Sequence, residues 1–208
     1  MGVESPPEAI EPAVERDVVL GEGVETSGPK QPLARRAVAE PSLLPLSTSA
    51  GTASVRIVGT HGGAGGSTLA ELLGEALAED AGHIWPRPQI WVPESATGSV
   101  LLLARTHHSG LESLREVLTS WHAGAYDEGL PLLGVCLVDD APHLVKAQIT
   151  EIKALTAMSP RGWHVPWQES LRIAPPSEVA VPARIRWTLS RIRHHATHRG
   201  THQKKENS

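Results

Sequence analysis

The chain contains one cysteine, Cys136, one tyrosine and no phenylalanine among its 208 residues. A single cysteine excludes a disulfide framework and any zinc site built from several cysteines. No apolar run approaches the roughly 18 residues that a membrane-spanning helix needs, because the longest ones, Val100–Ala104 and Leu130–Val138, have the length of a strand. The N-terminus also lacks the basic-then-apolar order of a signal peptide. We therefore expect a cytoplasmic protein with no membrane partner.

Composition and charge divide the chain into parts. Hydrophobic residues make up 40% and charged residues 20%, which is enough for a folded core. Residues 1–52 hold eight acidic residues, four basic residues and seven prolines without any periodicity, and are predicted to be a disordered leader. We expect one domain over residues 53–197 and a disordered polar tail over 198–208. Residues 184–208 hold seven basic residues and one acidic residue, although the net charge of the whole chain is −4.

Strand and helix patterns alternate through the expected domain. Buried strands are predicted at 55–59, 99–104 and 132–138, with a short fourth strand at 162–166, and amphipathic helices at 67–81, 109–123, 143–158 and 182–197. The segment 83–94 is rich in proline and is predicted to be a loop or at best a short edge strand. This alternation indicates a three-layer α/β fold, with helices on both faces of a mostly parallel sheet in which strand 55–59 is central. Ligands of such sheets bind at the carboxyl ends of the strands.

A glycine-rich turn follows the first buried strand and leads into a helix. Five of its ten residues, Gly59–Thr68, are glycines. Glycines let successive backbone N–H groups curl around an anion, and the positive end of the following helix adds to the attraction. Ser67 stands where a hydroxyl would meet Mg²⁺. The sequence therefore predicts a phosphate-binding loop, and the alternative is a merely flexible turn between a strand and a helix.

The loop resembles the deviant Walker A signature of the ParA/MinD class of P-loop ATPases, Lys-Gly-Gly-x-Gly-Lys-[Ser/Thr]-Thr. The resemblance implies nucleotide or phosphate contacts, with ATP and Mg²⁺ as the ligand, for Gly62, Gly63, Ala64, Gly65, Gly66, Ser67 and Thr68. His61 and Gly66 occupy the two lysine positions of the signature. Asp139 is the counterpart of an asparagine that helps to read adenine in that class. The segment 82–98 contains no aspartate and is short, so the chain looks like a truncated P-loop fold without a Walker B aspartate.

These losses weaken the chemistry that a P-loop supports. A hydrogen bond to a charged group contributes roughly 1.5–3 kcal/mol, so loss of the lysine lowers affinity about ten- to a hundred-fold. His61 does not replace it, because imidazole is mostly neutral at pH 7. Arg105, at the end of a predicted strand, is the candidate for a compensating phosphate contact, and an ordinary surface salt bridge is the alternative for it. We expect no catalytic residues and no resident metal site.

The chain also resembles an uncharacterised actinobacterial family over roughly residues 55–175. The shared features are a glycine loop without lysine, the dipeptide Trp85-Pro86, the strand end Ala104–His107 and the dipeptide Pro166-Trp167. This resemblance implies no known activity.

Three further groups of polar residues need an interpretation. His107 is predicted to be a loop histidine with its hydrogen bonds satisfied. Asp139 and Asp140 could hold magnesium, or Asp140 could cap the following helix, which is the favoured interpretation. The last helix, over residues 182–197, is amphipathic and basic, and its arginines are either solvated or in contact with DNA phosphates. These arginines are Arg184, Arg186, Arg191 and Arg193.

We therefore favour a degenerate ParA/MinD-like protein, a pseudo-NTPase that binds nucleotide weakly or without hydrolysis and acts through contacts with an unknown protein partner. One alternative is an active ATPase with a substituted phosphate-contacting residue. Another is a DNA-associated accessory factor of plasmid transfer or partition.

Overall fold

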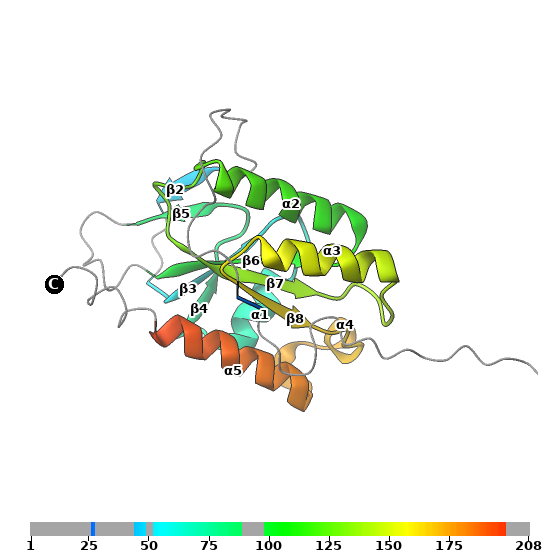
Figure 1. Cartoon of the computed structure of the whole chain (residues 1–208). Coiled ribbons are helices and arrows are strands. Elements are labelled where there is room, and N and C mark those ends of the chain that lie inside the picture. Colours follow the sequence, from blue (N-terminus) through cyan, green and yellow to red (C-terminus); the bar gives the residue numbers. More distant parts are fainter. Residues whose placement is uncertain (1–25, 28–43, 49–51, 89–97, 199–208) are drawn as a thin grey trace, which may run out of the picture.

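A computed structural model of the chain describes residues 26–27, 44–48, 52–88 and 98–198 (Figure 1). Its main sheet has six strands in the order β1-β8-β7-β6-β3-β4. The strands are β1 (Thr26–Ser27), β3 (Val55–Gly59), β4 (Ala78–Asp80), β6 (Ser99–Arg105), β7 (Leu132–Val138) and β8 (Arg161–Val165). Only β1 pairs antiparallel, with β8, and the other five strands are parallel. The expected mostly parallel sheet is therefore confirmed.

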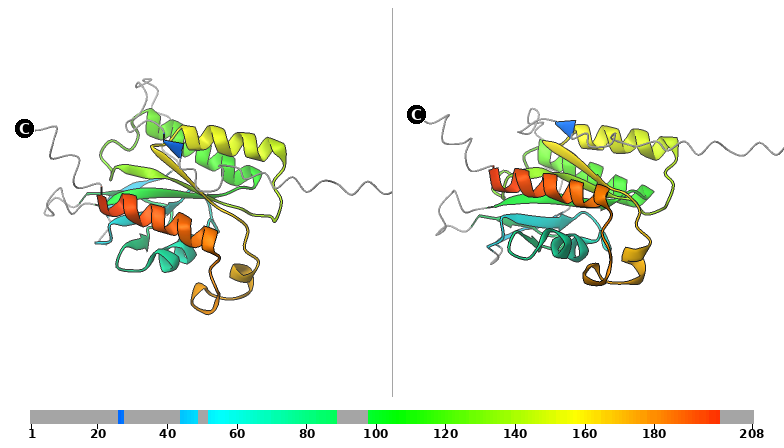
Figure 2. Two further views of the ribbon diagram at one scale, coloured as in Figure 1. Left: turned by 60° about the horizontal axis from the view of Figure 1, so that its bottom comes forward. Right: turned by 90° about the horizontal axis from the view of Figure 1, so that it is seen from below.

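Helices cover both faces of this sheet (Figure 1 and Figure 2). Helices α2 (His108–His122) and α3 (Lys146–Ala157) pack on one face, and α1 (Gly66–Leu73) and α5 (Ala183–His198) pack on the other. A short helix, α4 (Ser170–Ile173), and a 3₁₀ turn at Pro176–Glu178 connect β8 to α5. None of the helices in the described ranges is both long and apolar enough to cross a membrane.

Successive residues of each strand point to opposite faces of the sheet and so contribute to both layers of the core. In β6, Leu101 and Leu103 face α1 and α5, whereas Leu102 and Ala104 face α2 and α3. A strand that is covered on both faces must be apolar at successive positions, which explains its unbroken apolar run. Cys136 of β7 lies in the α1 and α5 layer, and burial raises the pKa of its thiol to about 12. The thiol is therefore unreactive at neutral pH.

Part of the predicted leader belongs to the fold. Strand β2 (Leu46–Thr48) pairs in parallel with β5 (Trp85–Arg87) in a separate two-stranded sheet. Leu44 is only 3% exposed, and its N–H donates to the hydroxyl of Tyr126. The prediction of disorder is wrong for these residues and for β1, and the rest of the leader and residues 199–208 lie outside the described ranges. Strand β5 shows that the segment after residue 83 contains a strand.

The helix predicted over residues 67–81 is wrong in its second half. Helix α1 ends at Leu73, where Gly74 adopts a φ of 93° and its N–H donates to the carbonyl groups of Ala70 and Glu71. The chain then turns into β4, which runs parallel to β3. This extra strand occupies the edge of the sheet, so β3 is the second strand from that edge and is not central as expected.

The strand order creates a topological switch point beside β3. The five parallel strands, numbered in chain order, follow the order 2-1-3-4-5, which is common among doubly wound sheets. From β3 the chain passes through α1 to β4 on one side, and it later returns to β6 on the other side. The loops after β3 and β6 therefore diverge, and the crevice between them is where such sheets bind ligands.

Candidate functional site

The glycine loop connects β3 to α1 at this switch point. Gly63 and Gly65 adopt φ values of 76° and 99°, which L side chains rarely reach. Gly65 is the N-cap residue of α1 and has no side chain to cap the helix. The backbone N–H groups from Gly62 to Thr68 donate no hydrogen bond within the described ranges. A run of N–H groups without acceptors at a helix N-terminus is the feature that attracts anions.

A carboxylate lies against Gly66, which stands at the position of the phosphate-binding lysine in the resembled signature. A Cβ atom built on Gly66 would lie 2.5–2.7 Å from the side-chain oxygens and Cγ of Asp80. The hydroxyl of Ser67 donates to Oδ2 of Asp80 at 2.9 Å, and the N–H of Gly82 donates to Oδ1 at 2.9 Å. Asp80 ends β4, and the sequence analysis missed it because that segment was assigned to the helix. Glycine at position 66 leaves room for this carboxylate.

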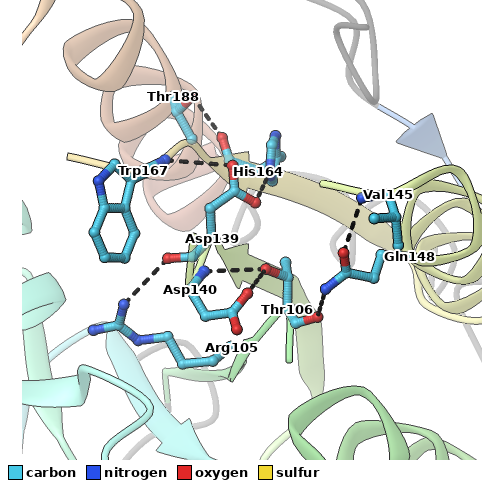
Figure 3. A network of polar contacts seen from close by, with 9 residues as sticks. All are labelled: Arg105, Thr106, Asp139, Asp140, Val145, Gln148, His164, Trp167 and Thr188. Atoms are coloured by element: carbon cyan, nitrogen blue, oxygen red, sulfur yellow. Dashed lines mark hydrogen bonds and ion pairs between the residues drawn. The ribbon is translucent and has the colours of Figure 1, made fainter. Parts of the chain in front are cut away.

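Arg105 places a cation beside the loop. It is the last residue of β6, and its Nη2 atom lies 3.8 Å from the Cβ position of Gly65. Its Nη1 donates to the carbonyl oxygen of Asp139 at 3.2 Å (Figure 3). The residue after β7 thus holds the guanidinium next to Gly65 of the loop. The compensating phosphate contact of Arg105 stays a prediction, and no carboxylate within the described ranges forms a salt bridge with it.

His61, at the first lysine position of the signature, is turned away from that role. Its Nε2 accepts a hydrogen bond from the backbone N–H of Arg105 at 3.0 Å, and its Nδ1 lies 2.9 Å from the carbonyl oxygen of Gly62. Burial lowers the pKa of its imidazole, and the neighbouring His107, His83 and Arg105 lower it further. The ring is therefore a neutral link between the loop and β6.

Asp139 contacts β8 and the loop that follows it (Figure 3). Its buried carboxylate accepts hydrogen bonds from Nε2 of His164 at 2.7 Å and from the N–H of Trp167 at 3.3 Å. These partners are fixed protein groups, so the carboxylate positions the loop after β8. Through its carbonyl group the same residue holds Arg105.

Asp140 links β6 and β7 and does not cap α3. Its Oδ1 accepts from the hydroxyl of Thr106 at 2.7 Å, and its N–H donates to the same hydroxyl oxygen. Helix α3 begins at Lys146 after the N-cap residue Val145, so the expected capping role and the expected start of the helix at residue 143 are both wrong. Gln148 of α3 completes the network by donating to the carbonyl oxygen of Thr106 (Figure 3).

His107 is satisfied, as predicted. It is the N-cap residue of α2, and its Nδ1 accepts from the N–H of Gly110 at 3.0 Å. The hydroxyl of Ser109 lies 3.1 Å from the same nitrogen. Because this nitrogen caps the helix, it is not free to act as a base.

A pocket of about 70 Å³ adjoins the glycine loop. The residues that line it include Gly65, Thr68, Arg105, Val138, Trp167 and Arg172. The guanidinium of Arg172 stacks on the ring of Trp167 at 5.3 Å from its centre. Pockets that enclose an organic ligand usually measure about 300–1,000 Å³. The space is smaller than such pockets, and much of its lining is apolar, with Leu69, Leu72 and Val165 beside the two arginines.

The match to a family model covers all of these site residues, from residue 53 to residue 189. The chain belongs to the family DUF6668. It is a family of unknown function. No curated protein and no solved structure matches the chain.

The basic helix α5 is anchored in the core, as one of the two interpretations expected. Ile185, Leu189 and Ile192 are buried in the layer beneath the sheet. Arg193 donates from Nη2 to the carbonyl oxygen of Leu72 at 2.8 Å and from Nε to that of Leu73 at 3.3 Å. Two of the four arginines thus have partners in the chain, since Arg191 stacks on Trp187 at 5.3 Å. The side chains of Arg184 and Arg186 are exposed.

Proposed function

We propose that the chain is a degenerate P-loop protein, similar to the ParA/MinD class, that binds the phosphate end of a nucleotide weakly, does not hydrolyse it, and acts through protein contacts. One observation carries the proposal: the backbone N–H groups of Gly62–Thr68 donate no hydrogen bond within the described ranges, and Nη2 of Arg105 lies 3.8 Å from the Cβ position of Gly65 in the same loop. Arginine is suited to phosphate because its planar donor groups match the oxygen atoms of the anion. In this proposal Arg105 replaces the missing lysine from a neighbouring strand.

The carboxylate of Asp80 explains why binding would be weak. It lies against Gly66 at the same helix N-terminus that would receive the anion. Two negative groups at one helix end repel each other unless a cation lies between them. Ser67 and Asp80 supply one hydroxyl and one carboxylate, and Mg²⁺ is commonly held by one or two carboxylates together with the phosphates of a bound nucleotide. The residues present therefore fit Mg²⁺ only when the phosphates complete its coordination.

Hydrolysis needs further groups that this site does not assemble. A P-loop enzyme positions an attacking water and neutralises charge on the transferring phosphoryl group. His107 caps α2, Asp140 pairs with Thr106, and Asp139 pairs with His164. No group of three or more metal-binding side chains occurs within the described ranges. The Ser67–Asp80 pair is the observation that favours the alternative of a slow ATPase, in which a partner supplies the remaining groups.

Calorimetric titration with ATP and Mg²⁺ tests the proposal. We expect weak binding by the full chain, no steady-state hydrolysis, and affinity about tenfold lower in Arg105→Gln, because a hydrogen bond between charged groups is lost. Arg184→Gln, on the exposed part of α5, is the matched control and should bind like the original chain. Asp80→Asn should bind ATP more tightly without Mg²⁺ and lose the benefit of adding it. Equal affinity in the Arg105 and Arg184 variants, or no binding by the original chain at millimolar ATP, would contradict the proposal.

A further inference from the structure

His61 joins the two halves of the candidate site. The residue belongs to the glycine loop, and the group that it contacts belongs to β6. Its Nε2 is 3.0 Å from the backbone nitrogen of Arg105, the residue whose guanidinium lies beside Gly65. The hydrogen bond from the backbone of Arg105 to His61 therefore connects the glycine loop to the end of β6 that carries the guanidinium.

The protonation state of the ring follows from its partners. A backbone N–H can only donate, so Nε2 must accept and cannot carry a proton. The other nitrogen, Nδ1, then carries the proton and donates to the carbonyl oxygen of Gly62 at 2.9 Å. The contact to Arg105 exists only while the ring is neutral, because a second proton on Nε2 would point at an N–H group.

Three basic side chains lie around the ring of His61. His107, at the start of α2, has its ring centre 4.8 Å from that of His61. His83 approaches from the turn after β4, and its Nδ1 lies 2.7 Å from the carbonyl oxygen of Gly59. Arg105 completes the set, and no carboxylate is among the groups that act on the ring. These three side chains oppose a charge on His61, and the carbonyl oxygen of Gly62 is the group that favours it.

We propose that His61 is a pH-sensitive positioning residue, which holds the glycine loop against Arg105 when neutral and releases it when protonated, so that anion binding is lost at acidic pH. The second half of this inference rests on the proposed function, and the first half does not. Burial and the neighbouring bases lower the pKa of His61. The contact is therefore intact at neutral pH and is lost as the pH falls through the lowered pKa, below the ordinary value of about 6.5.

Nuclear magnetic resonance of the ligand-free full chain tests the contact itself. Ring ¹⁵N shifts should show that His61 is protonated at Nδ1 near neutral pH, with a midpoint below the ordinary imidazole value of about 6.5. The backbone amide signals of Gly63 and Gly65 should change with the same midpoint as the ring. A proton on Nε2, or a midpoint at or above about 6.5, would overturn the proposal.

Two substitutions of His61 test the hydrogen bond to Arg105 separately from the titration of the imidazole ring. The amide of His61→Gln reaches the position of Nε2 and can accept from Arg105 without titrating, whereas the shorter side chain of His61→Asn stands in for Nδ1 and leaves the N–H of Arg105 without a partner. We expect the loop signals of His61→Gln to lose the change that has the midpoint of the His61 ring and to resemble those of the original chain at neutral pH. His108→Gln is the control, and its loop signals should follow pH as those of the original chain do. A change with that same midpoint in the loop signals of His61→Gln would overturn the proposal.

Sulfate binding tests whether the contact between His61 and Arg105 affects anion affinity, because the charge of sulfate does not change over this pH range. Its affinity should fall from pH 7.5 to pH 5.5 in the original chain, by less than about tenfold because the pKa of His61 lies below its ordinary value of about 6.5, and His61→Gln should not show this fall. Tighter sulfate binding at pH 5.5 would mean that the added charge attracts the anion, which would overturn the proposed loss of binding. If neither sulfate nor ATP binds, the proposed function fails, and the ring and amide titrations still decide whether His61 holds the loop.

Discussion

The absence of a side chain at Gly66 leaves the space that the carboxylate of Asp80 occupies. The closest protein atoms to a side chain at this position are the oxygens of Asp80, which are fixed by Ser67 and Gly82. We expect Gly66→Ala to lower the free energy of unfolding by about 1–3 kcal/mol, the usual cost of crowding a packed site. Urea unfolding followed by circular dichroism would measure the change.

Gly62→Ala is the matched control for this substitution. Its Cβ would meet nothing within 4 Å, so its stability should be close to that of the original chain. The double variant Gly66→Ala with Asp80→Ala should recover most of the loss, because the colliding carboxylate is gone. If Gly66→Ala is as stable as Gly62→Ala, the close contact with Asp80 is wrong. A lysine at position 66 would meet the same carboxylate.

The residues of the site were predictable to the extent that their signal was local. The glycine loop and Arg105 could be predicted, because a Gly-rich turn after a strand and a basic residue at the end of the next strand are visible in the sequence. Asp80 could not be predicted, since apolar residues continue with helical spacing past Gly74 and hide the end of α1. The role of Asp139 depends on His164, which is 25 positions away, so no local pattern reveals it.

At the scale of elements, strong periodicity gave reliable predictions and weak periodicity did not. Strands β3, β6 and β7 and helices α2 and α5 appear within a residue or two of their predicted ranges. Strands β2 and β4 were missed, and β5 was expected only as the alternative to a loop, because strands of three residues carry no period of their own and are stabilised by the strand beside them. Helix α3 starts three residues later than predicted, since its entry is set by the contacts of Gln148 with Val145 and Thr106.

Helix α5 offers a test of whether its basic residues are structural. Arg193 donates to two carbonyl groups at the C-terminal end of α1, where a cation also interacts favourably with the helix dipole. We expect Arg193→Gln to lower the free energy of unfolding by about 1 kcal/mol. Arg186→Gln, exposed on the same helix, should leave it unchanged. Thermal unfolding of the two variants provides the comparison.

DNA binding is the competing interpretation of the same helix, and it predicts the opposite order. If α5 binds phosphates, the exposed Arg184 and Arg186 matter most, and their replacement would weaken a gel shift without changing the melting temperature. A stable Arg193→Gln variant that has lost DNA binding would contradict the structural role. The buried stripe of Ile185, Leu189 and Ile192 supports the structural role, because a helix docked through this stripe needs no further partner to be stable.

At the scale of the whole molecule, the folded part extends beyond the match to the family model. The match begins at residue 53, yet Leu44 is buried against the α2 and α3 side of the sheet, and β2 pairs with β5. Trp85 of β5 is fully buried, stacks on Tyr126 at 4.0 Å between ring centres, and donates to the carbonyl group of Leu130. Residues of the segment 44–48 therefore pack against core residues that lie inside the matched region.

Truncation tests this extended boundary. A chain that begins at residue 52 loses Leu44 and β2, and we expect it to melt well below a chain that begins at residue 43. Burial of one leucine contributes roughly 1.5–3 kcal/mol, and each kcal/mol corresponds to about 2–4 °C for a domain of this size, so the difference should be about 3–12 °C. Leu44→Ala in the full chain should account for most of it, because Leu→Ala changes in a core cost about 2–5 kcal/mol. Ser47→Ala, on an exposed position of β2, is the control and should leave the melting temperature unchanged. Equal melting of the two truncated chains would mean that residues 44–48 add nothing to the core, and the domain would then begin where the family match does.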